Sequence, residues 1–281
     1  MEIIESTKMM ADYSQKLREK GNTIALVPTM GFLHKGHLSL MEAAKSHADT
    51  ILVSIFVNPT QFGPNEDLDT YPRDMERDLA LCRDMGVSAV FTPTVEELYP
   101  QDFQTYVELT RLPLHLCGLS RPGFFRGVAT VVSKLFHITC PHVAMFGEKD
   151  FQQLVVIRQM VKDMCMPIKI VGVPIVRESD GLAMSSRNAY LTPEQRSNAL
   201  LLSKSLENAK KMTAQGETDA SKILRQTRQI LLSCPDMKID YVSICDPDSL
   251  EETDRIQAPA LLALAATLGK TRLIDNCILT P

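Results

Sequence analysis

Five short, almost continuously apolar runs recur through the first two-thirds of the chain. They cover residues 23–28, 51–57, 87–93, 142–147 and 168–176. Each run has the length of a strand and is rich in Val and Ile, as is typical of strands buried on both faces of a parallel sheet. Helical patterns lie between most of them, at 37–47, 73–85, 125–138 and 151–165. This alternation predicts an α/β fold with a doubly wound parallel sheet.

The alternation of strand-like runs and helical patterns changes after about residue 177. A helix is expected in "TPEQRSNALLLSKSLENAKKM", with a Thr cap and a Pro at its first position, and a second helix over 217–233. Three strands are expected in "KIDYVSICD", "ALLALAATLG" and "TRLIDN". We therefore predict two domains, one over 1–176 that holds the parallel sheet and a smaller α+β domain over 177–281.

Composition disfavours several classes of protein. With 44% hydrophobic and 23% charged residues, the chain has the composition of an ordinary globular protein. Its net charge of −4 does not favour a nucleic-acid binder. Seven cysteines, an odd number without a C-x-x-C pair, favour a reducing compartment. The N-terminus lacks the positive charge of a signal peptide, and the longest apolar stretch, 258–269, is too short to span a bilayer. We expect a cytoplasmic protein without a membrane or nucleic-acid partner.

Dense polar loops follow four of the predicted strands. They read "PTMGFLHKGH", "NPTQFGPNEDLDTYPRD", "GEKDFQQ" and "RESDGLAMSSRN". Ligands of open parallel sheets bind outside the carboxyl ends of the strands, and those ends share one edge of the sheet. We therefore expect the four loops to converge on one binding site.

Two histidines mark the first of these loops. Gly31 permits a tight turn off the strand, and Gly36 leaves the backbone at the helix start open to a ligand. A helix N-terminus favours phosphate, and the imidazoles of His34 and His37 can each donate a hydrogen bond to a phosphate oxygen. A metal site would need further ligands, and no third one falls at helical spacing nearby. From spacing alone, phosphate binding, metal ligation and a purely structural pair remain open.

Two further loops carry candidate phosphate ligands. Lys149 can reach a phosphate as a point charge, and Asp150 can cap the following helix, hold a ribose hydroxyl or bind magnesium through water. The segment "MSSR" adds two hydroxyls and a guanidinium, which are groups suited to clamp phosphate. The structural alternatives are a helix cap with a solvated lysine and an ordinary serine-rich turn. The sequence contains neither a P-loop nor the dinucleotide fingerprint G-x-G-x-x-G.

The H-x-G-H motif after the first strand, together with the later M-S-S-R segment, resembles the nucleotidyltransferase superfamily. Within that superfamily the chain is similar to the pantothenate synthetase (pantoate–β-alanine ligase) family. The similarity covers nearly the whole chain and runs, in order, through "VPTMGFLHKGH", "SIFVNPTQFGPNEDLDTYPR", "RPGFFRGV", "FGEKDFQQ", "GVPIVRESDGLAMSSRNAYL" and "TRLIDN".

The resemblance implies an ATP-dependent ligase that joins (R)-pantoate to β-alanine in coenzyme A biosynthesis. The pantoate carboxylate would attack the α-phosphate of ATP to give pantoyl adenylate and pyrophosphate. The β-alanine amine would then attack the adenylate and release AMP and pantothenate. The family also implies a Rossmann-like N-terminal domain, a C-terminal domain that closes as a lid, a homodimer, and Mg²⁺ bound mainly through the phosphates of ATP.

The family's functional residues carry over onto matching positions. His37 matches the residue assigned as catalytic proton donor. The ATP-binding positions are Met30, Gly31, His34, Gly36, His37, Gly147, Glu148, Lys149, Asp150, Val176, Met184, Ser185, Ser186 and Arg187. The positions implied for pantoate and β-alanine are Asn58, Gln61, Tyr71, Arg121 and Gln153. No certain metal ligand is carried over.

Some positions depart from the family pattern. Phe124 stands where the family commonly has His, so a phosphate contact is not carried over there, whereas Arg121 and Arg126 are retained. Phe32 and Lys35 also differ from the usual residues, and helical spacing directs them away from the ligand, so the same reaction is expected.

Three rival functions remain to be weighed against the ligase. A plain nucleotidyltransferase shares H-x-G-H but needs neither the paired glutamines nor the last hundred residues. A non-catalytic nucleotide-binding protein would not need the complete polar set after four strands. A tRNA synthetase is disfavoured by the negative net charge of the chain and by the lack of an anticodon-binding extension.

Overall fold

The structure, a computed structural model, describes residues 1–64 and 66–281. Contacts between residues divide the chain into two units. The first consists of Met1–Thr110, Arg121–Glu148 and Val156–Pro174, and the second of Arg111–Ser120, Lys149–Val155 and Ile175–Pro281. Two short internal segments therefore group with the C-terminal residues. The predicted domain boundary near residue 176 stays a prediction.

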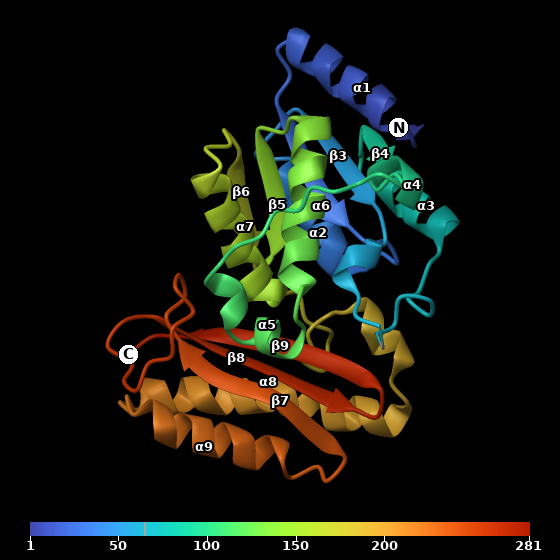
Figure 1. Cartoon of the computed structure of the whole chain (residues 1–281). Helices are drawn as coiled ribbons and strands as arrows, with labels where there is room; N and C mark the ends of the chain where they lie inside the picture. Colours follow the sequence, from blue (N-terminus) through green and yellow to red (C-terminus); the bar gives the residue numbers. More distant parts are fainter. Residues whose placement is uncertain (65) are drawn as a thin grey trace. The chain divides into compact units, whose positions relative to one another are not determined.

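A six-stranded parallel sheet forms the centre of the first unit (Figure 1). Its strands lie in the order β1-β4-β3-β2-β5-β6. Their bounds are β1 (Glu2–Ile4), β2 (Ile24–Thr29), β3 (Thr50–Ile55), β4 (Ala89–Phe91), β5 (Val143–Gly147) and β6 (Lys169–Val173). The five predicted apolar runs are confirmed as β2 to β6. Nearly all residues of β2 to β5 are buried, as expected of strands covered on both faces, whereas β6, at an edge of the sheet, buries only Val173.

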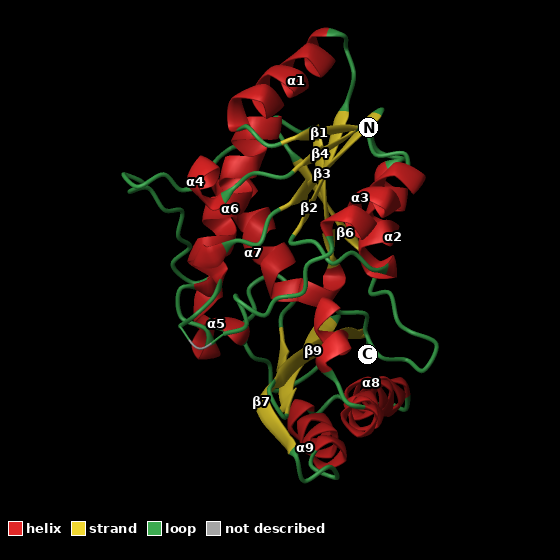
Figure 2. Ribbon diagram, turned by 90° about the vertical axis from the view of Figure 1, so that its right-hand side faces the viewer, coloured by secondary structure: helices red, strands yellow, loops and turns green. Residues whose placement is uncertain are grey.

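Helices cover both faces of this sheet, which confirms the doubly wound, Rossmann-like fold. Figure 2 shows α2 and α3 on one side, and α1 and α6 on the other. Apolar side chains of α2 and of β2, β3 and β5 form one buried cluster. The helices that lie wholly or partly in the first unit are α1 (Thr7–Glu19), α2 (Lys35–Ala44), α3 (Met75–Asp84), α4 (Val95–Leu98), α6 (Phe124–Thr139) and α7 (Phe151–Asp163), with the 3₁₀ helix η1 (Pro59–Gln61).

Strand β1 and helix α1, at the N-terminus, were not predicted from the sequence. Strand β1 has three residues at the edge of the sheet and pairs only with β4, so its run is too short to show alternation. Helix α1 begins at Thr7, after an N-cap residue, Ser6, whose side chain forms no capping hydrogen bond. It has no acidic residue in its first turn and buries only Met10 and Ser14. Apart from the Ser at its N-cap, its sequence therefore has few start signals, and its apolar stripe is narrow.

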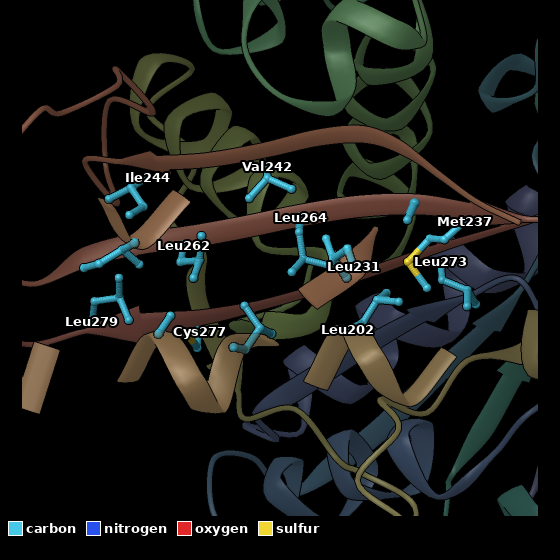
Figure 3. Close-up of a cluster of buried hydrophobic side chains, with 14 of the residues drawn as sticks. Leu202, Leu231, Met237, Val242, Ile244, Leu262, Leu264, Leu273, Cys277 and Leu279 are labelled. Carbon is cyan, nitrogen blue, oxygen red and sulfur yellow. The ribbon is translucent and has the colours of Figure 1, made fainter. Parts of the chain in front are cut away.

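A three-stranded antiparallel sheet, covered on one face by two helices, forms the body of the second unit. The strands are β7 (Met237–Cys245), β8 (Ala260–Leu268) and β9 (Thr271–Leu279), and the long helices are α8 (Pro193–Ala214) and α9 (Ala220–Leu231). Alternate residues of the strands pack against α8 and α9 in one apolar cluster (Figure 3). This confirms the smaller α+β unit predicted from the C-terminal patterns.

Short helices complete the second unit. They are η2 (Leu112–Leu114), α5 (Cys117–Ser120), η3 (Glu148–Asp150), which begins in the first unit, and η4 (Ser186–Tyr190). The predicted Thr cap of α8 is confirmed, and Thr192 and Gln195 form a capping box there. Over the part of the chain that the structure describes, no helix is both long and apolar enough to cross a membrane.

Candidate functional site

The direction of winding reverses between β2 and β5. From β2 the chain proceeds to β3 and β4 on one side, whereas β5 and β6 lie on the other side of β2. Such a switch point leaves a crevice at the carboxyl ends of the two central strands, where ligands of open α/β sheets bind. The loop that starts at Met30 leaves β2 at this point, and Glu148 follows the last residue of β5, Gly147. The first predicted loop and the start of the third therefore emerge from neighbouring strands.

His34 and His37 cap the start of α2 with their own side chains. The backbone N–H of Gly36 donates to Nδ1 of His34 at 3.1 Å, and the N–H of His34 donates to Nδ1 of His37 at 3.2 Å. The two rings lie with their centroids 4.1 Å apart. A ring nitrogen that accepts a hydrogen bond carries no proton, so each ring bears its proton on Nε2. Each histidine thus presents an Nε2–H donor on the side opposite the helix cap.

This arrangement alters the interpretation of the helix start. The sequence suggested unpaired backbone N–H groups as phosphate donors, but His34 accepts the N–H of Gly36, and His37 accepts the N–H of His34. The structural and functional interpretations of the pair are therefore compatible, because Nδ1 serves the cap while Nε2 is directed away from it. The two histidine side chains supply donors in place of the backbone groups that they occupy.

The turn before this helix has an unusual backbone. Gly31 and Phe32 both have positive φ, +82° and +48°, and Phe32 is not a residue that favours this region. The carboxylate of Asp78 in α3 holds the turn, accepting from the N–H of Phe32 at 2.6 Å and from that of Leu33 at 2.7 Å. The neighbouring Arg77 donates from Nη2 to the carbonyl of Leu33 at 2.9 Å. Helix α3 therefore fixes the path of the chain into His34.

Asp78 is a buried carboxylate that the sequence interpretation missed. Its side chain is 1% exposed, and burial raises its pKa, although the two backbone N–H groups and Arg77 oppose that shift. A signal was present in the sequence, since Asp78 lies four residues before the buried Cys82 and so shares the inward face of α3. A carboxylate on the apolar face of a helix indicates a specific partner, here the turn that precedes the H-x-G-H motif.

Asn58 and Gln61 bind each other at the end of β3. Asn58 Nδ2 donates to Oε1 of Gln61 at 2.8 Å and to the carbonyl of Gly127 at 3.2 Å. Both side chains are buried, and Gly127 of α6 allows the approach, because a Cβ there would meet the carbonyl oxygen of Thr60 at 2.2 Å. With its oxygen occupied by Asn58, the amide of Gln61 presents its Nε2–H groups as donors.

Arg121 joins the same cluster. Its Nη2 donates to the backbone carbonyl of Gln61 at 3.0 Å, and its Nε donates to Oε1 of Glu66 at 2.7 Å. The guanidinium lies 3.8 Å from the ring centroid of Phe124, so the aromatic residue that replaces the usual His supports Arg121 by a cation–π contact. Asn65, which belongs to the same motif, lies outside the described residues. Tyr71 is buried and meets the ring of Phe62 edge to face.

Lys149 and Asp150 lie in the second unit at the start of α7. Lys149 Nζ and Asp150 Oδ2 are 4.0 Å apart, and their side chains are 20% and 50% exposed. The adjacent glutamines Gln152 and Gln153 have different surroundings. Gln152 is buried and donates to the carbonyls of Leu112 and His115, whereas Gln153 beside it is half-buried. Gln152 therefore holds the turn next to Gln153, a role that the sequence did not assign.

Residues 176–184 form a small hairpin that leads into the M-S-S-R segment. The N–H of Met184 donates to the carbonyl of Val176 at 3.0 Å, and the hairpin turns at Gly181, where φ is +97°. Ser185 then caps η4, since its Oγ accepts from the N–H of Arg187 at 3.3 Å. The structural interpretation of this serine as a turn residue is thus correct, and the hydroxyl of the buried Ser186 follows directly.

Metal binding and thiol chemistry are two alternative uses of such a site. Among the residues that the structure places, no three His, Cys, Asp or Glu side chains gather as a metal site would require. The seven cysteines, all within the described residues, form no disulfide, and burial raises the pKa of Cys82, Cys245 and Cys277 to about 12. These three thiols stay protonated near neutral pH and are poor nucleophiles.

Comparison with protein families places the chain beside one group of enzymes. A family model described as Pantoate-beta-alanine ligase matches residues 2–278. A relative named pantothenate synthetase, from Desulfatibacillum aliphaticivorans, is 57% identical over 281 residues, which are 100% of both chains. A second relative of that name, from Geobacter sulfurreducens, is 54% identical over 279 residues, covering 99% of each chain.

Solved structures give the same grouping. The pantothenate synthetase of Thermus thermophilus superposes with a TM-score of 0.95 at 42% identity, covering 100% of both chains. A pantoate-beta-alanine ligase from Francisella tularensis, solved as a complex with beta-gamma ATP and beta-alanine, superposes with a TM-score of 0.82 at 34% identity. That match covers 99% of the present chain and 97% of the other.

Proposed function

The chain belongs to the family of pantoate-beta-alanine ligases, and we propose that it joins (R)-pantoate to β-alanine in two steps through a pantoyl adenylate. A carboxylate oxygen of pantoate bonds to the α-phosphorus of ATP and displaces pyrophosphate. The ammonium of β-alanine loses one proton, the resulting amine bonds to the acyl carbon, a second proton leaves the nitrogen, and AMP leaves with that oxygen. The observation that carries the proposal is the H-x-G-H turn at the switch point, with both Nε2–H groups directed away from the helix cap.

The ATP-binding positions that the family implies occur in both units, and their side chains differ in kind. In the first unit, Met30, Gly31 and Gly36 shape the ATP turn, and the Nε2–H groups of His34 and His37 donate to phosphate oxygens. Adenylation builds negative charge on the α-phosphate, so a donor already aimed there lowers the barrier. We assign the catalytic contact to His37 and a binding contact to His34. Gly147, the last residue of β5, and Glu148, which follows it, lie at the same edge of the sheet.

In the second unit, the donors are charged or carry hydroxyls. Lys149 meets the phosphates as a point charge, and Asp150 lies on the ribose side. Val176 and Met184 close the base of the hairpin that presents Ser185, Ser186 and Arg187, whose hydroxyls and guanidinium suit phosphate oxygens. No side chain needs to act as a covalent nucleophile, because the substrate carboxylate does so itself.

Pantoate binding is assigned to neutral amides and one cation. Gln61 and Gln153 hold the hydroxyl and carboxylate groups of pantoate without adding a competing negative charge, and Gln61 also borders the β-alanine position. Asn58, Tyr71 and Arg121 line the same part of the first unit. The fixed orientation of the Gln61 amide, with Oε1 held by Asn58, supports its role as a donor.

Replacing Gln61 by Ala should impair the use of pantoate selectively. A substrate group that loses its partner in a buried site costs about 1–3 kcal/mol, so kcat/KM for pantoate should fall about 10- to 100-fold. The KM for ATP should change by less than about threefold. Steady-state kinetics with each substrate varied in turn measure both values. Gln159→Ala, at a half-buried glutamine of α7 whose side chain forms an exposed hydrogen bond with Asp163, serves as the control. An unchanged pantoate kcat and KM in Gln61→Ala would refute this assignment.

Magnesium fits the proposed site as a companion of ATP. Mg²⁺ usually keeps several waters and is bound through substrate phosphates with only one or two protein carboxylates. Asp150, which is half exposed beside Lys149, is the more exposed of the two carboxylates in that segment. When bound, the ion neutralises charge on the phosphates, and the side chains of the site still have to orient them.

Further properties belong to this proposal and rest on the family and on the sequence patterns. The enzyme works as a homodimer in the cytoplasm, in coenzyme A biosynthesis. Residues 1–176 form the Rossmann-like domain that binds ATP and pantoate, and residues 177–281 form a lid domain. Light scattering of the purified protein tests the dimer, since a mass near 31 kDa rather than twice that value would contradict it.

One assay separates the ligase from a plain nucleotidyltransferase. The enzyme is supplied with ATP, Mg²⁺ and pantoate, and the release of pyrophosphate and AMP is followed with and without β-alanine. A ligase should release AMP in steady state only when β-alanine is present, together with one pantothenate per AMP. Steady release of AMP that ignores β-alanine would contradict the proposal.

A further inference from the structure

Two adjacent polar residues in the middle of β9 remain without an assigned role. Asp275 and Asn276 belong to the motif "TRLIDN" near the C-terminus, far in sequence from either ATP segment of the second unit. Both side chains are buried, at 2% and 6% exposure. Buried polar groups of this kind are placed for a specific partner, because they cost free energy when they lack one.

Asp275 binds the hairpin that leads to the M-S-S-R segment. Arg177 reaches its carboxylate with two nitrogens, Nη1 at 2.7 Å and Nη2 at 2.9 Å. The same guanidinium donates from Nη1 to the carbonyl of Gly181 at the hairpin turn, at 3.1 Å. Hydrogen bonding to Asp275 raises the pKa of Arg177, so the pair stays charged. Arg177 thus ties the first arm and the turn of the hairpin to one point on β9.

Asn276 binds the other ATP segment. Its Nδ2 donates to the backbone carbonyl of Lys149 at 2.9 Å, and its own N–H donates to Oδ1 of Asp275 at 2.8 Å. The contact holds the main chain of Lys149, from which the side chain extends. The backbone of Lys149 is therefore fixed in position, whereas the side chain that ends in the ammonium keeps its rotamers.

The register of β9 directs these two residues to opposite faces of the sheet. Asp275 pairs with Leu264, whose side chain lies in the cluster under α8 and α9, whereas Asn276 pairs with Ala263. Because successive side chains of a strand alternate, Asn276 faces away from that cluster. One strand thus holds the hairpin by one face and the Lys149 segment by the other. We propose that Asp275 and Asn276 are positioning residues that fix Lys149 and Ser185–Arg187 relative to one another for the reaction with ATP.

Stability alone does not account for this arrangement. A buried ion pair is often no more stabilising than apolar side chains of similar volume. The neighbouring positions of β9, Leu273 and Cys277, show that this face of the strand accepts apolar residues. The polar pair instead fixes a geometry, and an error of about 1 Å in the position of a catalytic group can cost about 100-fold in rate.

The inference rests on the proposed ligase activity and is tested through its first step. In Asn276→Ala, the carbonyl of Lys149 loses its donor, and kcat/KM for ATP in pantoate-dependent ATP–pyrophosphate exchange should fall about 10- to 100-fold. Conversion of supplied pantoyl adenylate and β-alanine to pantothenate should change by less than about threefold, since pyrophosphate takes no part in it. Ser243→Ala is the matched control, because Ser243 lies in the same cross-strand row and binds Glu252, which belongs to neither segment.

A second variant separates positioning from folding. In the double variant Arg177→Met with Asp275→Leu, apolar side chains replace the buried pair, so the thermal midpoint should stay within a few degrees of the wild type. Exchange should still fall at least about tenfold through the higher KM for ATP. Wild-type exchange kinetics in both variants, or equal losses in exchange and in the adenylate reaction, would overturn the inference. A wild-type enzyme without pantoate-dependent exchange would instead refute the ligase proposal itself.

Discussion

The variant His37→Ala should lower kcat by about 100- to 1000-fold while raising the KM for ATP far less. A loss of this size is usual when a single preorganised donor to a developing charge is removed. The Nε2–H of His37 is such a donor in the proposed adenylation, whereas the ATP contacts proposed for His34 and for Lys149 are not altered by this substitution. Initial rates of pyrophosphate release with ATP and pantoate varied give both parameters.

His37 also has a structural role that this experiment must separate. Its Nδ1 accepts the N–H of His34, and loss of such a cap costs about 1 kcal/mol of stability. Gln at this position of a capping box can reach the same N–H, so His37→Gln should regain stability without regaining kcat. The exposed His47→Ala is the control for loss of an imidazole. Equal losses of kcat and ATP affinity in His37→Ala would reduce His37 to a binding residue.

Removal of the Asp78 carboxylate should have the second large effect. Asp78→Ala leaves the N–H groups of Phe32 and Leu33 buried without their acceptor, at about 1–3 kcal/mol each. The sum is a large part of the total stability of a domain, so we expect a strongly lowered thermal midpoint and little activity. In Asp78→Asn the side chain keeps its shape, but its amide N–H faces one of the two backbone N–H groups and cannot accept a hydrogen bond from it. This variant should stay folded and lose about 10- to 100-fold in kcat/KM for ATP, because the turn into His34 shifts.

The pH dependence of Asp78→Asn adds an independent check. Burial raises the pKa of Asp78, so the folded protein holds this proton more tightly than the unfolded chain does. Stability from this group is therefore fully present below the unfolded pKa, near 3.8, and is lost as pH rises through the higher folded pKa. The stability of the wild type relative to Asp78→Asn should then decline as pH rises from about 4 toward 7, as measured by denaturant unfolding. A relative stability that increases over this range would show that the pKa of Asp78 is lowered in the folded state.

Most of the parallel sheet could be predicted from the sequence because its signals are local. The runs that became β2 to β6 are apolar on both faces, and Thr192 with Pro193 marked the start of α8. The N-terminal α1 was not predicted because no acidic residue follows Ser6 in its first turn and its apolar stripe is narrow, with only two of its residues buried. Local patterns thus predict an element when its own residues contain both its periodicity and its ends.

The residues that hold the candidate site in place could not be predicted from local sequence patterns. His34 and His37 stand in a recognisable spacing, whereas Asp78 contacts their turn from 45 residues away in sequence. The bond from Asn276 to Lys149 spans 127 residues, and the ion pair of Arg177 with Asp275 spans 98. No periodicity connects such positions, because only the folded chain brings them into contact. Sequence motifs therefore identified the groups proposed to meet the ligand, and the structure identified the groups that hold them.

Transfer of oxygen from pantoate tests the adenylate pathway most directly. The enzyme is supplied with ATP, Mg²⁺, β-alanine and pantoate labelled with ¹⁸O in both carboxylate oxygens, and the products are analysed by mass spectrometry. If the carboxylate attacks the α-phosphorus and AMP then leaves the acyl carbon, each AMP should contain one ¹⁸O and pyrophosphate none. Label in pyrophosphate, or AMP without label alongside pantothenate, would contradict the proposed reaction.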